Sequence, residues 1–428
     1  MHIYFSGVGG VGIGPLALLA RDCGYLVSGS DLYESEMTST LTSQDIRISI
    51  GQDGSQIATE HTSSPIDWFV YSSALPKDHP ELVFAQQNNI KISKRSEFLN
   101  HVLKEKKLRL LAVSGTHGKT TTTGMLIWLF QQLKVPVSYS IGTTVPFGPP
   151  AQYQTGSEYF IYECDEFDRN FLDFKPYLSI IPSVDYDHAD IYPTQADYDY
   201  AFLDFIAESQ RCLLWQESAD HLQLTDTANV SILSPNDPGK QSIRLAGEHM
   251  RRNAWLAVQA VHEIFLQTEP AQLAARIGSF PGTNRRFEKL ATNLYTDYAH
   301  HPVEIAAVIE MAKEINPNVV VIYQPHQNIR QHEILKENGY QKCFESAKIT
   351  YWLPTYLSRE NQNLPTLSST DLIATTSANT KTQYIEMGTE LLAKIKEHQN
   401  AGDLVVAMSA GDLDHWLRDA LSSASDKI

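Results

Sequence analysis

One pattern occurs three times along the chain: a short apolar run is followed by glycine and then by a stretch with helical spacing. The runs predict strands at residues 3–5, 110–113 and, after a proline-glycine turn, 294–297. Such alternation is typical of α/β units with parallel strands. Because 428 residues exceed what one hydrophobic core usually supports, we predict an α/β protein of two or three domains.

The net charge of −16 argues against a nucleic-acid binder, since such a protein needs basic surface to neutralise phosphates. The apolar runs fall far short of a membrane span, so neither a nucleic acid nor a membrane is expected as a partner. The amino terminus lacks the basic stretch and longer apolar core of a secretory signal, which predicts a cytoplasmic protein. The four cysteines are widely spaced and are expected as buried thiols: Cys23, Cys164, Cys212 and Cys343.

The strongest local signal is the loop Gly115-Thr116-His117-Gly118-Lys119-Thr120, between an apolar run and a helical stretch. In such a loop, backbone N–H groups face phosphate oxygens, the lysine reaches the β- and γ-phosphates, and the last hydroxyl binds Mg²⁺. The loop is a shortened relative of GxxxxGK[ST], because Val113 stands five residues before Gly118. The alternative is a glycine turn without a ligand.

Four carboxylates occur within residues 163–168, directly after the apolar run 159–162. They would repel one another, and a divalent cation relieves that repulsion, as when Mg²⁺ binds one or two carboxylates together with substrate phosphates. The next expected strand, 178–181, leads into a polar segment at 185–190 that contains His188, at what should be the same sheet edge. The alternative is a solvated acidic turn.

A glycine fingerprint spans residues 7–12, and Asp31 follows about twenty residues later. A pyrophosphate can approach the backbone of such a loop, and the aspartate can contact a ribose. Three interpretations remain open here: a nicotinamide or flavin dinucleotide, a nucleotide-sugar diphosphate, or a tight β–α turn without a ligand.

Cationic and polar side chains gather near expected strand ends in the last third of the chain. Arginine suits phosphate and carboxylate binding through its planar fork, whereas exposed arginine pairs are often only solvated and the histidines can be packing residues. The candidates are Arg285, Arg286, Asp297, His300, His301, His326 and Arg330.

The order of these motifs resembles the Mur ligase family along nearly the whole chain, most closely the branch that joins L-alanine to UDP-N-acetylmuramate. Phe202 stands near the position where many Mur-type ligases carry a lysine that is carbamylated in use, which suits this branch. Met250 and Gln327 depart from the family pattern. The matching segments are 7–14, 29–31, 71–74, 115–123, 163–168, 187–188, 285–288, 297–302 and 324–326.

The resemblance implies three domains: a Rossmann-like UDP-sugar domain at 1–105, a central P-loop ATPase domain with a mostly parallel sheet at 106–281, and a C-terminal Rossmann-like domain at 282–428. It implies ATP as a substrate and Mg²⁺, or Mn²⁺, as the cofactor. The implied metal ligands are Thr120, Glu163 and His188. The implied catalytic residues are Lys119, Glu163, His188 and Arg286.

The resemblance also implies three groups of binding residues, with Asn253 facing adenine and Asp297 the ATP ribose. The ATP-binding group comprises Gly115, Thr116, His117, Gly118, Lys119, Thr120, Thr121, Asn253, Arg285 and Asp297. The UDP-sugar group comprises Gly9, Gly10, Val11, Gly12, Asp31, Ser72 and Ser73. The amino-acid group comprises His300, His301, His326 and Arg330.

In the implied reaction, a substrate carboxylate attacks the γ-phosphate of ATP, and an amino group attacks the resulting acyl phosphate to give an amide, ADP and phosphate. The implied partners are UDP-N-acetylmuramate, ATP and L-alanine, in peptidoglycan precursor synthesis, and a monomer or homodimer is expected. Three alternatives remain: a recycling ligase that attaches a murein tripeptide, a Rossmann oxidoreductase, and a non-catalytic nucleotide-binding regulator.

Overall fold

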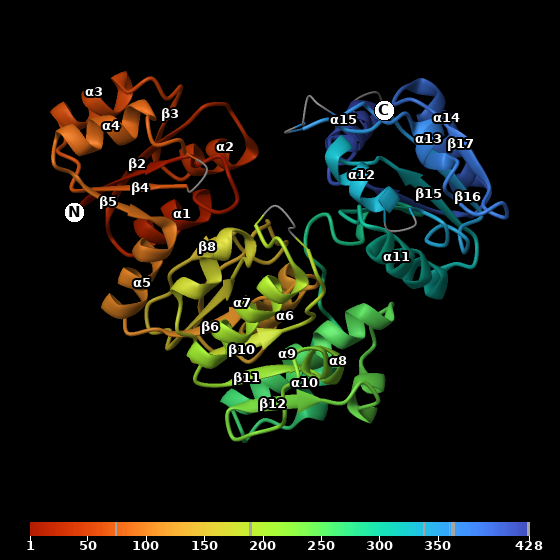
Figure 1. The fold of residues 1–428 in the computed structure, drawn as a ribbon, viewed down its shortest axis with the longest axis horizontal. Helices are drawn as coiled ribbons and strands as arrows, with labels where there is room; N and C mark the ends of the chain where they lie inside the picture. The colour runs from red at the N-terminus through yellow and green to blue at the C-terminus, as the bar shows by residue number, and fades with distance from the viewer. Residues whose placement is uncertain (73–74, 188–190, 337–338, 359, 361–363, 426–428) are drawn as a thin grey trace. The chain divides into compact units, whose positions relative to one another are not determined.

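A computed structural model describes residues 1–72, 75–187, 191–336, 339–358, 360 and 364–425. Within these residues, the chain forms three β-sheets that follow one another in sequence, with helices between the strands (Figure 1). The strands are mostly parallel, which confirms the predicted α/β class.

The first sheet has the order β3-β2-β1-β4-β5, and each neighbouring pair is parallel. The order reverses between β1 and β4, and in such a sheet ligands bind outside the carboxyl ends of the strands at that point. Its strands are β1 (His2–Ser6), β2 (Leu26–Asp31), β3 (Arg47–Ile50), β4 (Trp68–Tyr71) and β5 (Lys91–Lys94). Its helices are α1 (Gly14–Asp22), α2 (Glu36–Ser43), α3 (Ser55–Ser63), α4 (Pro80–Gln87) and α5 (Arg95–Glu105).

Apolar residues of β1 and β4 pack on both faces of this sheet, because successive side chains of a strand point to opposite faces. Ile3 and Phe5 join a core with helices α1 and α5. Tyr4 and Phe69 join a second core with helices α3 and α4. The first sheet is therefore the middle of three layers.

The second sheet has the order β12-β11-β10-β6-β9-β7-β8 and is parallel except for the pair β7–β8. Strand β6 lies between β9 and β10, so the carboxyl ends of all three meet at one edge. The strands are β6 (Arg109–Val113), β7 (Ser138–Ser140), β8 (Ala151–Gln152), β9 (Tyr159–Glu163), β10 (Leu178–Ile181), β11 (Cys212–Trp215) and β12 (Val230–Leu233). The helices are α6 (Lys119–Gln132), η1 (Phe167–Asp173), α7 (Gln195–Glu208), α8 (Gln216–His221), η2 (Pro238–Ser242), α9 (Glu248–Ile264) and α10 (Pro270–Ile277).

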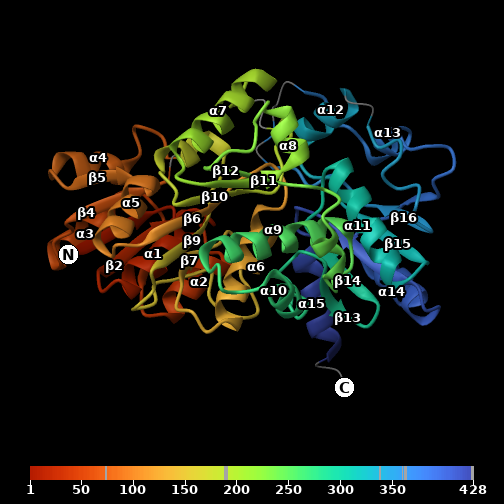
Figure 2. The ribbon, with the colours of Figure 1, turned by 90° about the horizontal axis from the view of Figure 1, so that it is seen from below.

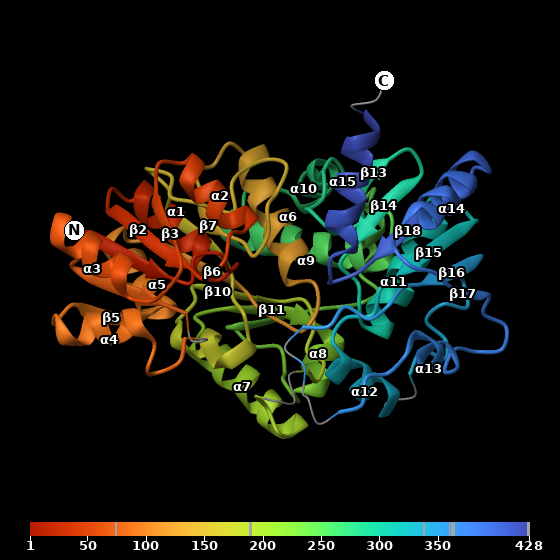
Figure 3. The same ribbon diagram turned by 90° about the horizontal axis from the view of Figure 1, so that it is seen from above.

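The third sheet has the order β13-β14-β18-β15-β16-β17 and is parallel except for the hairpin β13–β14. Alternate residues of β15 and β18 belong to two apolar cores, one on each face of the sheet. Helix α11 packs on one face, and α14 and α15 pack on the other (Figure 3). The strands are β13 (Glu288–Ala291), β14 (Leu294–Asp297), β15 (Val319–Tyr323), β16 (Ile349–Trp352), β17 (Thr382–Tyr384) and β18 (Leu404–Met408). The helices are α11 (Pro302–Ile315), α12 (Asn328–Lys336), α13 (Ser369–Ile373), α14 (Thr389–Asn400) and α15 (Leu413–Ser425).

The chain divides into two compact units. The first comprises Met1–Ile243 and Arg252–Phe280, and the second comprises Arg244–Arg251 and the chain from Pro281 onward. Within the first unit, one apolar core runs from β1 and β4 to β6 and β9, and α10 packs against α6 (Figure 2). Helix α9 contributes its first residues to the second unit.

The lysine-rich segment 104–107 has the composition of a solvated linker, but only part of it is one. Helix α5 continues to Glu105, and Lys106 is only 20% exposed. Its ammonium group pairs with Glu105, donates to the carbonyl oxygen of Cys23 and lies over the Tyr25 and Tyr153 rings. The long aliphatic stem allows lysine to cover apolar surface while its charge stays paired.

All four cysteines are free thiols, and three of them are buried, as expected; Cys23 is partly exposed. Among the described helices, none has enough consecutive apolar residues to cross a bilayer.

Candidate active site

The glycine loop of the second sheet follows β6 and leads into α6. Gly115 and Gly118 have φ values of 153° and 83°, a region that favours glycine. The N–H groups of Thr116 and His117 donate to the carbonyl and hydroxyl oxygens of Ser183. The N–H groups available for phosphates are therefore those of the first turn of α6, which have no partner within the helix.

Lys119 lies against an internal carboxylate. Its Nζ donates to Glu166 Oε1 at 2.8 Å and to the Gly115 carbonyl oxygen at 2.6 Å, and Glu166 is fully buried. Burial opposes the charge of Lys119, but the carboxylates of Glu166, Asp165 and Glu163 outweigh it and raise its pKa. The lysine is therefore charged at neutral pH and placed beside the loop that the sequence predicts for phosphates.

Glu163 and Thr120 form an oxygen-rich corner at the carboxyl end of β9. The Thr120 hydroxyl donates to Glu163 Oε1 at 2.6 Å, and the N–H of Gly142 donates to Oε2 at 2.7 Å. Carboxylate and hydroxyl oxygens suit Mg²⁺, so these two residues fit the predicted cofactor. The third predicted ligand, His188, lies outside the described residues, among which no group of three His, Cys, Asp or Glu side chains is placed to hold a metal.

Asn253, the predicted adenine contact, lies beside the phosphate loop. It is 8% exposed on α9, and a Cβ atom on residue 118 would lie 2.8 Å from its Oδ1. A Cβ at this position would also lie 3.1 Å from Pro182 Cβ. The loop therefore approaches α9 so closely that a side chain at residue 118 would require Asn253 or Pro182 to shift.

We expect Gly118→Ala to lower the affinity for ATP at least tenfold and to destabilise the first unit. Alanine is strained at a φ of 83° and would also displace Asn253 or Pro182. The matched control is Gly156→Ala, because Gly156 has a φ of 85° but a Cβ there meets nothing within 4 Å. Calorimetric titration with ATP measures the affinity of each variant. Equal affinities for Gly118→Ala and Gly156→Ala would contradict the close approach of the loop to α9.

The glycine loop of the first sheet is held by its own neighbours. The N–H of Gly9 donates to Asp31 Oδ2 at 2.6 Å, and the N–H groups of Gly7 and Val8 donate to the Ser30 carbonyl oxygen. Among the predicted UDP-sugar residues, Gly9, Gly10, Val11 and Gly12 lie in this loop, Asp31 ends β2 and Ser72 follows β4 at the same edge, and Ser73 lies outside the described residues.

In the second unit, Asp297 ends β14 and accepts hydrogen bonds from the N–H groups of Phe287 and Ala299, each at 2.7 Å. Burial raises its pKa to about 6, although Arg286 opposes the shift. The guanidinium groups of Arg285 and Arg286 lie 4.9 and 5.1 Å from the centre of the Tyr298 ring. Two predicted ATP contacts and a predicted catalytic arginine thus share one strand end.

The predicted amino-acid residues follow β14 and β15 in the same unit. His326 stacks on Tyr356 with ring centres 5.8 Å apart and meets the edge of His300. Burial, with the charges of His300 and Arg330, lowers the pKa of His326 to about 4, so it is neutral at pH 7. Arg330 pairs with Glu333, and His301 caps the start of α11.

Three family models match consecutive parts of the chain: "Mur ligase family, catalytic domain" over residues 2–107, "Mur ligase middle domain" over 113–232, and "Mur ligase, glutamate ligase domain" over 285–411. A relative from Clostridium perfringens, described as a UDP-N-acetylmuramate–L-alanine ligase, is 31% identical over 96% of this chain and 95% of its own. The chain belongs to the Mur ligase family.

Further relatives agree with this membership. A UDP-N-acetylmuramate–L-alanine ligase from Syntrophomonas wolfei is 29% identical over 96% of this Mur ligase and 94% of the relative. The crystal structure of a UDP-N-acetylmuramate-alanine ligase from Thermotoga maritima shares the fold over both whole chains, with a TM-score of 0.78 at 24% identity. A murein peptide ligase from Psychrobacter arcticus shares it at a TM-score of 0.64 and 20% identity, over 99% of this chain and 98% of that one.

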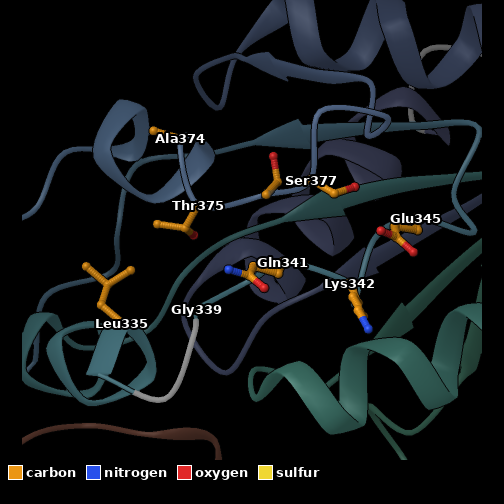
Figure 4. A pocket seen from close by; sticks show the side chains of 9 residues that line it. Leu335, Gly339, Gln341, Lys342, Glu345, Ala374, Thr375 and Ser377 are labelled. Atoms are coloured by element: carbon orange, nitrogen blue, oxygen red, sulfur yellow. The ribbon is translucent and has the colours of Figure 1, made fainter.

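The Mur ligase also has a surface pocket of 490 Å³ in its second unit, around the end of α12 and the segment after α13 (Figure 4). The hydroxyls of Thr375 and Thr376 that line it already donate to the backbone carbonyls of Leu372 and Ile373. No predicted site residue lines this pocket, so the candidate site is built from the strand ends instead.

Several residues beside the sites were not assigned a role from the sequence. Glu166 stands inside the acidic segment, but only the structure shows that its carboxylate binds Lys119. Gly142 contacts Glu163 through its backbone N–H, and Tyr356, which stacks on His326, lies in a segment without regular periodicity. No sequence pattern therefore indicates a site role for either residue.

His249 predicts a pH dependence of stability for the Mur ligase. Burial and the charges of Arg286 and Arg251 lower its pKa to about 4, against the opposing charges of Glu314 and Glu304. Because the unfolded chain binds the proton near pH 6.5, this group stabilises the fold above that pH, and the contribution is lost as pH falls toward 4.

We therefore expect wild type to lose more unfolding free energy between pH 7 and pH 5 than His249→Gln does. Urea denaturation of both proteins at each pH measures the difference. The comparison with the variant is needed because Asp297, whose pKa is raised, changes the pH dependence of the unfolding free energy in the opposite direction. Parallel losses in the two proteins would contradict the prediction.

Proposed function

We propose that this Mur ligase joins L-alanine to the lactyl carboxylate of UDP-N-acetylmuramate, with hydrolysis of ATP to ADP and phosphate through an acyl phosphate. The observation that carries the proposal is the match over 96% of the chain to enzymes described by this reaction. The charged Lys119 beside the phosphate loop supports the ATP-dependent step.

The first chemical step brings a substrate carboxylate to the γ-phosphate of ATP, so two anions must approach each other. Lys119 offsets that charge from its place at the loop, and Arg286 is proposed to contribute a second cation. Thr120 and Glu163 would hold Mg²⁺, with His188 as a third proposed ligand. When bound, the metal would neutralise charge on the phosphate oxygens.

In the second step the amino nitrogen attacks the acyl carbon, the bond from that carbon to the phosphate oxygen breaks, and inorganic phosphate leaves. The neutral imidazole of His326 is suited to accept a hydrogen bond from the amino group, and Arg330 to pair with the amino-acid carboxylate. His300 and Tyr356 border the imidazole and would fix its orientation.

Phe202 supports the L-alanine branch over ligases that use a carbamylated lysine. Its side chain is fully buried and packs on Phe171 and Tyr198 in an aromatic cluster. A lysine there would place an ammonium group or a carbamate in an apolar core, at a cost of several kcal/mol. The metal site of this protein is therefore proposed to work without that group.

We also propose the three domains as 1–105, 106–281 and 282–428, with the remaining residues of the ATP, UDP-sugar and amino-acid groups in the roles given above. A cytoplasmic location and a monomeric or homodimeric state are part of the same proposal.

The test measures phosphate release from ATP with Mg²⁺ and UDP-N-acetylmuramate, comparing L-alanine, L-serine, glycine and an L-alanyl-D-glutamyl-diamino acid tripeptide. Release that needs both the UDP-sugar and L-alanine is expected. Release with the tripeptide alone would assign the protein to murein-peptide recycling. ATP binding without release for any acceptor would reject the ligase and favour a nucleotide-binding regulator.

A further inference from the structure

Arg95 occupies the same sheet edge as the first glycine loop. It is the first residue of α5 and follows β5, whose carboxyl end lies beside that of β4. Since every neighbouring pair in this sheet is parallel, the loop after β1, Asp31 at the end of β2 and Arg95 share one edge. Nothing in the sequence pattern distinguishes Arg95 from a surface arginine.

The guanidinium group covers the backbone of the loop at Gly12. A methyl group on residue 12 would overlap Arg95 Nη1 and lie 3.8 Å from its Cδ. The absence of a side chain at Gly12 therefore makes room for the guanidinium, which brings a cation directly onto the loop that the proposed function assigns to the UDP-sugar.

Within the part of the chain that the structure describes, few groups engage the hydrogen-bond donors of Arg95. Its side chain is 16% exposed, and its Nε is buried without a hydrogen-bond partner among those residues. Its ion-pair partner is Asp165, with Nη2 and Oδ2 3.9 Å apart, beyond hydrogen-bond length. A buried donor without a partner is costly, and a guanidinium presents five donors in a planar fork suited to phosphate oxygens.

Asp165 connects this arginine to the second sheet. It lies between Glu163, the proposed metal ligand, and Glu166, which binds Lys119. One guanidinium thus lies between the UDP-sugar loop and the acidic segment of the ATP site.

We propose that Arg95 binds the diphosphate of the UDP-sugar above Gly12 and exchanges it against Asp165, so that sugar-nucleotide binding changes the charge balance beside Lys119. The inference rests on the proposed function for the identity of the diphosphate. It names Arg95 as a binding residue, and Asp165 as the group that competes for it.

The test is calorimetric titration with UDP-N-acetylmuramate, UDP, uridine and pyrophosphate. Arg95→Ala is expected to weaken UDP binding about 10- to 100-fold and to leave uridine binding within about twofold, because uridine lacks the phosphates. The UDP affinity of Arg95→Lys is expected to lie between those of wild type and Arg95→Ala, since lysine keeps the charge but not the planar fork of donors. Arg21→Ala is the control, because Arg21 pairs with Asp22 on α1.

A double-mutant cycle tests the exchange. Asp165→Asn is expected to strengthen UDP binding several-fold in the wild-type background and less than about twofold in Arg95→Ala, because the competition acts through Arg95. Equal effects of Asp165→Asn in both backgrounds would overturn the exchange.

The remaining outcomes separate this inference from the proposed function. If wild type ligates L-alanine and Arg95→Ala binds UDP as wild type does, or loses uridine and UDP equally, Arg95 is not a diphosphate ligand. If wild type binds pyrophosphate through Arg95 but neither binds UDP-N-acetylmuramate nor ligates, Arg95 stands as an anion-binding residue and the proposed function fails.

Discussion

Lys119→Ala is expected to reduce ATP-dependent ligation about a thousandfold at saturating substrates, the largest effect on activity that we predict. The structure places the ammonium group of Lys119 on the phosphate loop by a direct hydrogen bond, at 2.6 Å to the Gly115 carbonyl oxygen. Alanine removes the charge that offsets the approach of carboxylate to phosphate. Phosphate release measured by a coupled assay gives the rate.

The same substitution removes the partner of Glu166, whose side chain is fully buried. Leaving one member of a buried pair without its partner typically costs about 3–5 kcal/mol, so a loss of rate must be separated from a loss of folding. The double variant Lys119→Ala with Glu166→Gln is expected to recover stability but not activity. Lys175→Ala, at a lysine that is 80% exposed, serves as the control. Near-normal turnover in a folded Lys119→Ala protein would refute the role of the lysine.

The second large effect is on stability: we expect Glu81→Ala to lower the free energy of unfolding by about 3 kcal/mol or more. Glu81 is fully buried, and its carboxylate accepts hydrogen bonds from Tyr4 OH at 2.8 Å, Ser6 Oγ at 2.5 Å and Ser30 Oγ at 2.8 Å. Alanine leaves three buried hydroxyls without their acceptor and opens a cavity beneath the first glycine loop.

Urea denaturation measures this loss, with Glu81→Gln and Glu36→Ala as comparisons. Glutamine keeps one oxygen acceptor and should lose about half as much, and Glu36 is exposed on α2. Because Ser30 also accepts from Gly7 and Val8, we expect the alanine variant to bind UDP more weakly as well. A fall of less than about 1 kcal/mol would show that the hydroxyls find other partners.

The sequence predicted most of what depends on local pattern. The strand expected at 178–181 agrees residue by residue with β10, because buried parallel strands consist of continuous apolar runs. The Lys119 loop and the acidic segment were expected at one sheet edge, and the pairing of β6 with β9 confirms it. The family membership followed from the order of such segments.

Contacts between distant segments were not predictable. The N–H groups of Thr116 and His117 were expected to face phosphates, yet both donate to Ser183, which the chain brings back after β10. Arg95 and Gly12 are 83 residues apart in the sequence. They meet only in the fold, because β1 and β5 end at the same edge of the first sheet. Pairwise geometry of this kind has no periodicity that a single sequence can display.

The pair formed by Lys119 and Glu166 makes nucleotide binding an exchange of anions. An incoming phosphate must displace a carboxylate that is already within 2.8 Å of the ammonium group, so the measured affinity is the difference between two ion pairs. Orthophosphate and sulfate carry less charge than a triphosphate and bring no divalent cation, so we expect them to compete poorly under that condition. A triphosphate accompanied by a divalent cation competes well, because it makes several contacts at once and its metal offers Glu163 and its neighbours a counter-charge. The buried glutamate is therefore expected to weaken the binding of small anions, which the net charge of −16 also disfavours.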